Sequence, residues 1–165
     1  MVMTLRFLRN KVVEVETHSE GILVVSWQLT DDLQKAEVNL LFQLPQLEIL
    51  EAKASIDRFV PQSCQSASEL IKKVEGISVG SGMRKIVAGL LGGPDGCSLL
   101  EEAVLESANA VILNFTRPGI EIAESMTDDD EKLKLFQEMV KSSPRLVRSC
   151  ISFQDDSPIM KELNL

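Results

Sequence analysis

Two cysteines, Cys64 and Cys97, stand in the same local context and carry the most suggestive chemistry in this sequence. Each lies just before a Ser-x-x-Glu motif, Ser66–Glu69 after the first and Ser98–Glu101 after the second. This motif is typical of a capping box, in which two side chains satisfy free N–H groups in the first turn of a helix. A thiol just outside a helix N-terminus experiences the positive end of the helix dipole, which favours the thiolate form. The sequence therefore predicts two thiols, each at the start of a helix.

Two converging thiolates would bind zinc, part of an iron-sulfur cluster or, transiently, a sulfane sulfur. Zinc and iron-sulfur centres normally take four ligands, so further groups are needed. Asp95 lies close to Cys97, whereas His18, the only histidine, is remote in sequence. We therefore name Cys64, Cys97 and Asp95 as candidate metal ligands, with solvent or a second copy of the chain completing the site. The alternative is that both thiols are small packing side chains, which free cysteines often are.

Composition and charge favour some classes of partner over others. The 165 residues carry a net charge of -8, and aromatic residues make up 4% of the chain, with no tyrosine. Because nucleic-acid binding depends on clustered lysine and arginine that neutralise phosphates, we expect no nucleic-acid partner. No apolar run approaches transmembrane length, so we expect no membrane partner. The three cysteines have no regular spacing, which argues against a secreted disulfide framework and favours a cytoplasmic location.

The first 60 residues alternate between apolar and polar side chains with period two, the pattern of strands with one buried face. The clearest runs are residues 21–29, 37–44 and 47–56. In the third run, the even-numbered residues from Leu50 to Ile56 form the apolar side. Short connections favour antiparallel neighbours. Residues 1–60 are therefore predicted to form a β-meander.

After Pro61 the apolar period becomes helical. Helices are predicted over residues 67–75, 82–91, 99 to about 115, and about 127 to 141. The third is predicted to end at Arg117-Pro118-Gly119, because proline lacks an N–H group. Strands followed by helices indicate an α+β fold, with the helices packed on one face of the antiparallel sheet. We expect a single domain over residues 1–165, consisting of the meander (1–60), a helical layer (61–143) and a C-terminal tail (144–165).

The glycine-rich turn Gly92–Gly96, followed by Cys97 and a long helix, resembles the bacterial family known as domain of unknown function 2889. Further matching segments are Ala52–Pro61, Cys64, Gly76-Ile77 and Gly80–Met83, so that the resemblance spans roughly residues 10 to 115. In that family a small hydroxyl residue, a histidine and a leucine follow the cysteine. Here Leu99 stands at the histidine position, which argues against a Cys-His metal site.

The order of Cys64, Gly76 and Cys97 is also similar to that in iron-sulfur scaffold proteins of the NifU/IscU type. In that fold an antiparallel sheet delivers a cysteine to a helix, a glycine closes the helix, and another cysteine begins a final helix. The scaffold has an additional cysteine on an earlier hairpin, but no cysteine precedes Cys64 here. The resemblance implies a NifU/IscU-like fold, with Cys64 and Cys97 as positions for an iron-sulfur or zinc ligand.

These features favour a binding or accessory module that resembles an iron-sulfur scaffold fold with an incomplete ligand set. One alternative is a carrier of metal, iron-sulfur or sulfur that uses Cys64 and Cys97. Another is an enzyme acting on a small molecule, for which the sequence identifies no catalytic residues. A protein partner and a homodimer both enter as hypotheses, the latter because an antiparallel sheet can expose an edge strand.

Overall fold

The structure is a computed structural model that describes residues 6–58, 60–143, 146–148, 150–161 and 163. The chain divides into two compact units, Met1–Asn114 and Phe115–Leu165, which are described separately. The organisation as one domain over residues 1–165 stays a prediction. Within the described part of the chain, no helix has the length and apolar character needed to cross a membrane.

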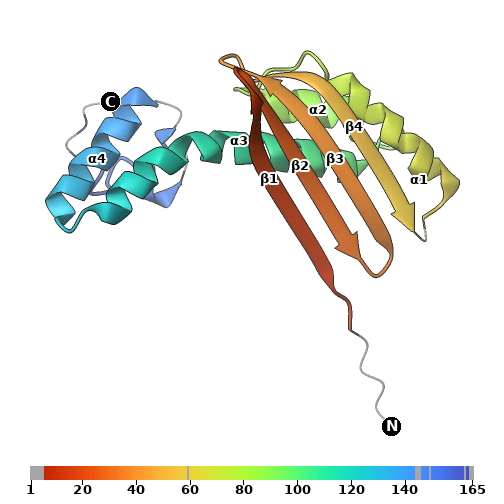
Figure 1. Cartoon of the computed structure of the whole chain (residues 1–165), viewed down its shortest axis with the longest axis horizontal. Coiled ribbons are helices and arrows are strands. Elements are labelled where there is room, and N and C mark those ends of the chain that lie inside the picture. Colours follow the sequence, from red (N-terminus) through yellow and green to blue (C-terminus); the bar gives the residue numbers. More distant parts are fainter. Residues whose placement is uncertain (1–5, 59, 144–145, 149, 162, 164–165) are drawn as a thin grey trace, which may run out of the picture. The chain divides into compact units, whose positions relative to one another are not determined.

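The first unit contains a four-stranded antiparallel sheet in the order β1-β2-β3-β4 (Figure 1). The strands are β1 (Arg9–Ser19), β2 (Ile22–Asp31), β3 (Gln34–Gln43) and β4 (Glu48–Arg58). Along β2 the alternate residues Leu23, Val25, Trp27 and Leu29 are buried, as the period-two pattern predicts. The predicted meander is therefore confirmed.

A bulge between β3 and β4 changes which side chains face the core. Leu41 pairs with Glu51, but Phe42 pairs with Ile49, so Leu50 is an extra residue on β4. An extra residue reverses the alternation of faces along the strand. As a result Ile49 is fully buried while Leu50 is 42% exposed. The prediction that Leu50 lies on the apolar side was wrong for this reason.

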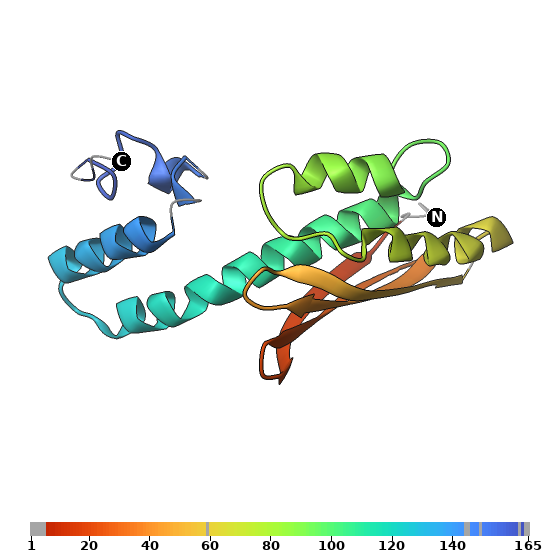
Figure 2. The ribbon, with the colours of Figure 1, turned by 90° about the horizontal axis from the view of Figure 1, so that it is seen from above.

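Helices cover one face of the sheet in the first unit (Figure 2). They are α1 (Gln62–Ala67), the 3-10 helix η1 (Ser68–Val74), α2 (Met83–Leu91) and the part of α3 (Ser98–Ser125) that belongs to this unit. The hydrophobic core lies between sheet and helices, and its buried members all fall between Leu23 and Val111. The α+β class, with helices on one face of an antiparallel sheet, is confirmed. The closer likeness to the NifU/IscU fold stays a prediction.

The two edges of the sheet differ. On the β4 edge, the N–H group of Ile49 donates to the carbonyl oxygen of Ile77 (2.9 Å), and that of Gly76 donates to Ile49 (2.8 Å). Further along this edge, the N–H group of Ala52 donates to the side chain of Glu75 (3.1 Å). The chain thus satisfies part of the β4 edge with its own later residues. The other edge is β1, which pairs with β2 alone among the described residues.

Helix α3 continues past the position at which it was predicted to end. Pro118 lies inside the helix, which runs to Ser125. Proline removes one backbone hydrogen bond, but an ion pair between Arg117 and Glu121 (2.6 Å) bridges this turn. Gly119 allows close packing here, because a Cβ atom at that position would lie 2.7 Å from the sulfur of Met139. These local contacts offset the lost bond, and the predicted end at Pro118 was wrong.

The second unit contains the last turns of α3, helix α4 (Asp129–Ser142) and the short 3-10 helix η3 (Ile151–Phe153). The side chain of Asp128 caps α4 by accepting hydrogen bonds from the N–H groups of Asp130 (2.8 Å) and Glu131 (3.0 Å). The buried apolar residues of the second unit are Ala123, Val140 and Met160. This unit therefore has a small core of its own.

Candidate functional site

A partly buried polar network joins β1, β2 and α3 in the first unit. Lys11 pairs with Leu29 across the strands and so lies on the helix-covered face of the sheet. Its ammonium group contacts the carboxylates of Glu102 (2.8 Å) and Glu106 (2.7 Å) on α3. The other oxygen of Glu106 accepts a hydrogen bond from the indole N–H of Trp27 at 2.5 Å. The fully buried Trp27 thereby fixes the position of a charged pair nearer the surface.

The environment of this network keeps its groups charged. Partial burial acts to raise the pKa of Glu106, but hydrogen bonds from Lys11 and Trp27 outweigh it, and the pKa lies below its ordinary value. The hydrogen bond to Glu102, followed by that to Glu106, raises the pKa of Lys11. Both oxygens of Glu106 are engaged by donors, so this carboxylate supports the structure and is poorly placed to act as a general base.

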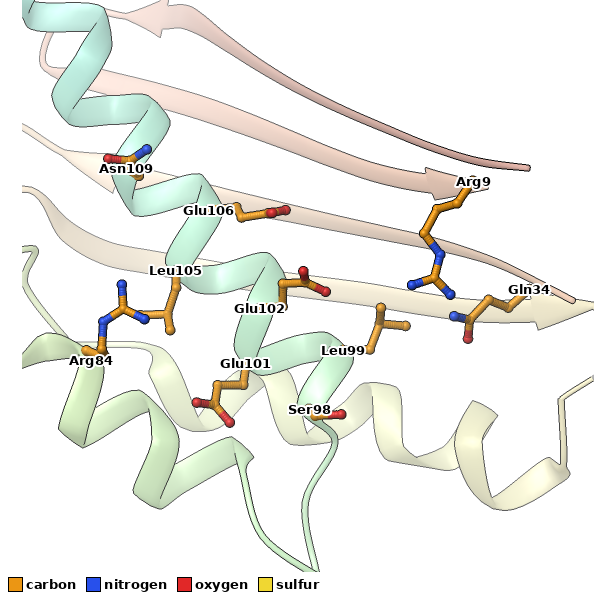
Figure 3. Close-up of a pocket in the computed structure, with 10 residues that line it drawn as sticks. All are labelled: Arg9, Gln34, Arg84, Ser98, Leu99, Glu101, Glu102, Leu105, Glu106 and Asn109. Carbon is orange, nitrogen blue, oxygen red and sulfur yellow. The ribbon is translucent and has the colours of Figure 1, made fainter. Parts of the chain in front are cut away.

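A hollow of about 900 Å³ lies across the outer side of the first turns of α3 (Figure 3). Helix α2 borders it on one side through Arg84, and the strands border it on the other through Arg9 and Gln34. The remaining lining residues all come from α3: Ser98, Leu99, Glu101, Glu102, Leu105, Glu106 and Asn109. The hollow therefore presents charged groups of both signs beside two leucines.

Asp31 holds the strand side of the hollow in place. Its carboxylate accepts hydrogen bonds from the N–H groups of Leu33 and Gln34 (2.8 Å each) and contacts the guanidinium of Arg9 (2.7 Å). Burial acts to raise the pKa of Asp31, yet the hydrogen bonds from Gln34, Leu33 and Arg9 outweigh it and lower the pKa. One carboxylate therefore orders the turn between β2 and β3 and orients the side chain of Arg9 in the lining.

The structure does not place Cys64 outside a helix. Helix α1 begins at Gln62, directly after Pro61, so Cys64 is half-buried within its first turn. The predicted capping box is not formed, because the Ser66 hydroxyl donates to the carbonyl oxygen of Gln62 (3.1 Å). Proline is favoured where a helix begins, which explains why the helix starts earlier than the Ser-x-x-Glu motif suggests.

Cys97 lies directly before α3, as predicted, and is half-buried against the core. Its carbonyl oxygen accepts a hydrogen bond from the N–H group of Glu101 (3.1 Å), while its own N–H group donates to Leu91 (2.6 Å). Cys97 therefore takes the N-cap position that was predicted for Ser98.

The candidate metal ligands are in different settings. Cys64 lies in α1, Cys97 precedes α3, and Asp95 is exposed in the turn after α2. Across the part of the chain that the structure describes, no group of three or more His, Cys, Asp and Glu side chains could hold a metal ion. Cys64, Cys97 and Asp95 as a metal site stay a prediction. His18 and Cys150 are both exposed.

Sequence reasoning missed the network of Lys11, Trp27, Glu102 and Glu106. Two local signals were present. Lys11 interrupts an alternation that places Val13 and Val15 on the same side of β1, and two glutamates stand four residues apart on a helix. A lysine at an inward strand position requires an acidic partner, but which helix supplies it depends on contacts between residues distant in sequence.

A family model described as "Protein of unknown function (DUF2889)" matches residues 30–113. No curated protein and no solved structure matches the chain. The matched segment begins near the end of β2 and ends in α3, so it includes the α2 and α3 sides of the hollow. Strand β1, with Arg9 and Lys11, precedes the matched segment.

Proposed function

The chain belongs to the DUF2889 family, and on that premise we propose that it is a binding module that receives a segment of a partner protein at the hollow on α3. The observation that carries this proposal is the charged lining of a 900 Å³ hollow whose wall is anchored to the buried Trp27 through Glu106. A wall fixed before binding loses little conformational entropy when a partner arrives, which favours affinity.

The chemistry of the lining defines the kind of partner. Arg84 and Glu101 border the hollow and have no ion-pair partner among the described residues. Arg84 can bind a carboxylate, and Glu101 can bind an ammonium or guanidinium group. Leu99 and Leu105 are half-buried and add limited apolar contact. This mixture suits a peptide segment with charged side chains better than an apolar small molecule.

Binding has more support here than catalysis. The described lining includes one hydroxyl group, that of Ser98, and neither a thiol nor an imidazole. The carboxylate of Glu106 is engaged by Lys11 and Trp27. An activated nucleophile needs a neighbouring base within hydrogen-bond reach, and the Ser98 hydroxyl has none that the structure describes.

The carrier hypothesis remains as an alternative prediction, supported by Cys97 at the start of the long helix α3. Anaerobic purification followed by analysis of zinc, iron and acid-labile sulfide tests it directly. A carrier would contain one of these, and Cys64→Ala and Cys97→Ala would each lose it. Metal-free protein with unchanged thiols after exposure to zinc and to iron with sulfide would reject the carrier hypothesis.

Peptide binding at the hollow can be measured with two labelled probes of about ten residues, one alternating Lys with Val and one alternating Glu with Val. We expect at least one probe to bind, and Glu101→Gln or Arg84→Gln to weaken binding about threefold or more. Glu124→Gln, an exposed change on the same helix outside the hollow, is the control. Failure of both probes, or equal effects of Glu101→Gln and Glu124→Gln, would contradict the proposal.

The remaining predictions from sequence concern location and other partners. A cytoplasmic location, the absence of a nucleic-acid partner, and a homodimer all stay predictions. The net charge of -8 supports the second of these.

A further inference from the structure

Strand β1 presents a long edge that the described chain leaves open. It is 11 residues long and pairs with β2 on one side. Most of its side chains are exposed, and Val12 on the outer face is 50% exposed. An edge of this length offers a row of backbone donors and acceptors to an additional strand.

The helix-facing side of β1 is incompletely covered. Val13 pairs with Trp27 and Val15 pairs with Val25. Trp27 and Val25 are fully buried, but Val13 and Val15 are only half-buried. Val13 and Val15 therefore leave apolar surface on the side of the sheet that faces Glu106 and the hollow. An additional strand beside β1 would cover this surface.

The usual protection of an edge strand is weak in β1. A lysine that points inward commonly prevents pairing with other chains, because a new strand would bury its charge. Here Glu102 and Glu106 already pair with Lys11. A bulge at Thr17 and Ser19 disturbs only the end of the strand. The opposite edge, β4, is partly closed by the chain itself through Gly76, Ile77 and Glu75, as described above.

The outer face of β1 selects the charge of the incoming strand. Glu14 and Glu16 are exposed and pair with Ser26 and Val24 across the sheet, so both lie on the face away from the helices. If a second copy paired antiparallel about the middle of β1, its glutamates would lie opposite or diagonal to these two. Like charges in such positions are destabilising, whereas opposite charges stabilise cross-strand pairs. The charge pattern thus disfavours self-pairing and favours a basic strand.

We propose that β1 is the docking edge for an extended segment of a partner protein that alternates Lys or Arg with apolar residues and adds antiparallel to the sheet. The basic side chains lie over Glu14 and Glu16, and the apolar ones lie beside Val13 and Val15. This inference rests on the proposed binding function and names the class of its partner. The hollow lies on the same side of the sheet and borders β1 through Arg9, so one segment can contact both.

The first experiment tests backbone pairing with the alternating Lys-Val peptide. Antiparallel strands exchange hydrogen bonds at alternate residues. We therefore expect N-methylation of alternate amides in one phase to abolish binding, and methylation in the other phase to leave it nearly unchanged. The peptide should also slow hydrogen exchange at alternate amides of β1 that β2 does not protect. Equal binding of the two methylated peptides, or unchanged exchange in β1, would overturn strand addition.

The second experiment tests charge selection. The full chain should bind the Lys-Val peptide about tenfold more tightly than the Glu-Val peptide at low salt, from a few cross-strand charge pairs. The double variant Glu14→Lys with Glu16→Lys should reverse that preference. A matched control, Glu51→Lys with Asp57→Lys, makes the same change on β4 and should keep the original preference. If control and test variants behave alike, the peptide does not recognise β1.

These outcomes separate the two proposals. Binding that depends on Glu101 and Arg84 but is insensitive to methylation phase would retain the hollow and reject strand addition. A second copy of the chain is the alternative occupant of the β1 edge. Analytical ultracentrifugation of the chain without peptide tests for it. A dimer that is lost on the β1 charge reversal or on peptide addition would overturn the heterologous partner and identify a second copy as the occupant.

Discussion

Glu106 connects the interior of the first unit with its surface. One oxygen accepts the indole N–H of the fully buried Trp27, and the other contacts Lys11, whose side chain is 30% exposed. Removing one member of such a network leaves its neighbour without a partner, and this cost usually exceeds the net contribution of the bond itself. The network should therefore influence stability through Glu106 more than through the peripheral Glu102.

Glu106→Gln is expected to destabilise the protein in a pH-dependent way. The fold lowers the pKa of Glu106 below its ordinary value of 4.5. The carboxylate therefore stabilises the folded state above that pH, and this contribution is lost as the pH falls through the folded pKa. Because about a third of the side chain is exposed, we expect a loss of only about 1 kcal/mol at neutral pH. The difference from the unsubstituted protein should shrink below about pH 4.5.

Urea unfolding followed by circular dichroism at several pH values measures this effect. Glu102→Gln is the matched control, because Glu102 also contacts Lys11 but its side chain is 45% exposed. A pH profile for Glu106→Gln that is identical to that of Glu102→Gln would show that the Trp27 contact contributes nothing.

At the scale of the elements, sequence patterns predicted the strands well and their irregularities poorly. The alternation in β2 identifies its buried face because the strand is regular from end to end. In β4 the bulge exchanges the roles of Ile49 and Leu50, and its position depends on the pairing partner in β3. Similarly, Pro118 and the Ser66–Glu69 motif are strong local signals that neighbouring contacts override.

The bulge in β4 predicts that substitutions at two adjacent residues will have very different effects on stability. Ile49→Ala should reduce the free energy of unfolding by about 3 kcal/mol, because it creates a cavity in the core. Leu50→Ala should cost less than about 1 kcal/mol, since the side chain is largely in solvent. Thermal or urea unfolding of the two variants checks this. Similar losses would show that the register shift is misplaced.

Two helical glycines make a second matched pair. A Cβ atom added at Gly89 in α2 meets no atom within 4 Å, whereas one at Gly119 in α3 approaches the sulfur of Met139. We expect Gly89→Ala to stabilise the protein by about 1 kcal/mol through lower backbone entropy in the unfolded chain. Gly119→Ala should gain less or lose stability, because Met139 must move. If thermal unfolding showed equal stabilisation by the two substitutions, α3 and α4 would not pack closely at Gly119.

At the scale of the whole molecule, the extent of the main hydrophobic core marks a boundary between two units, which composition and length do not reveal. The main core cluster uses residues from Leu23 to Val111, and the family match ends at residue 113. The boundary between the two units lies inside the continuous helix α3. The local signal nearest to it, Arg117-Pro118-Gly119, lies inside the helix and does not end it, so the sequence pattern does not locate the boundary.

A fragment of residues 1–114 is expected to fold without the second unit, because the residues of the main core all lie within it. Circular dichroism should show mixed helix and strand, and heating should give one cooperative transition. An unfolded fragment, compared with a folded full-length chain, would show that residues 115–165 are required for this core.

Like the boundary between the units, the hollow is not located by any local pattern in the sequence. Its lining comes from β1, β3, α2 and α3, and its anchoring residues, Lys11, Trp27 and Glu106, are far apart in the chain. The cysteines suggested a site because their motifs are contiguous. A site assembled from distant residues becomes visible only when the sheet and helices are in contact.

Trp27 has a consequence for spectroscopy. It is the only tryptophan in a chain that has no tyrosine, so the ultraviolet emission of the protein reports on this one indole. Its N–H group donates to a carboxylate at the wall of the hollow. A change in the charge or position of Glu106 should therefore shift the emission. The protein thus carries an intrinsic optical reporter of the network that anchors its hollow, and no label has to be introduced to follow it.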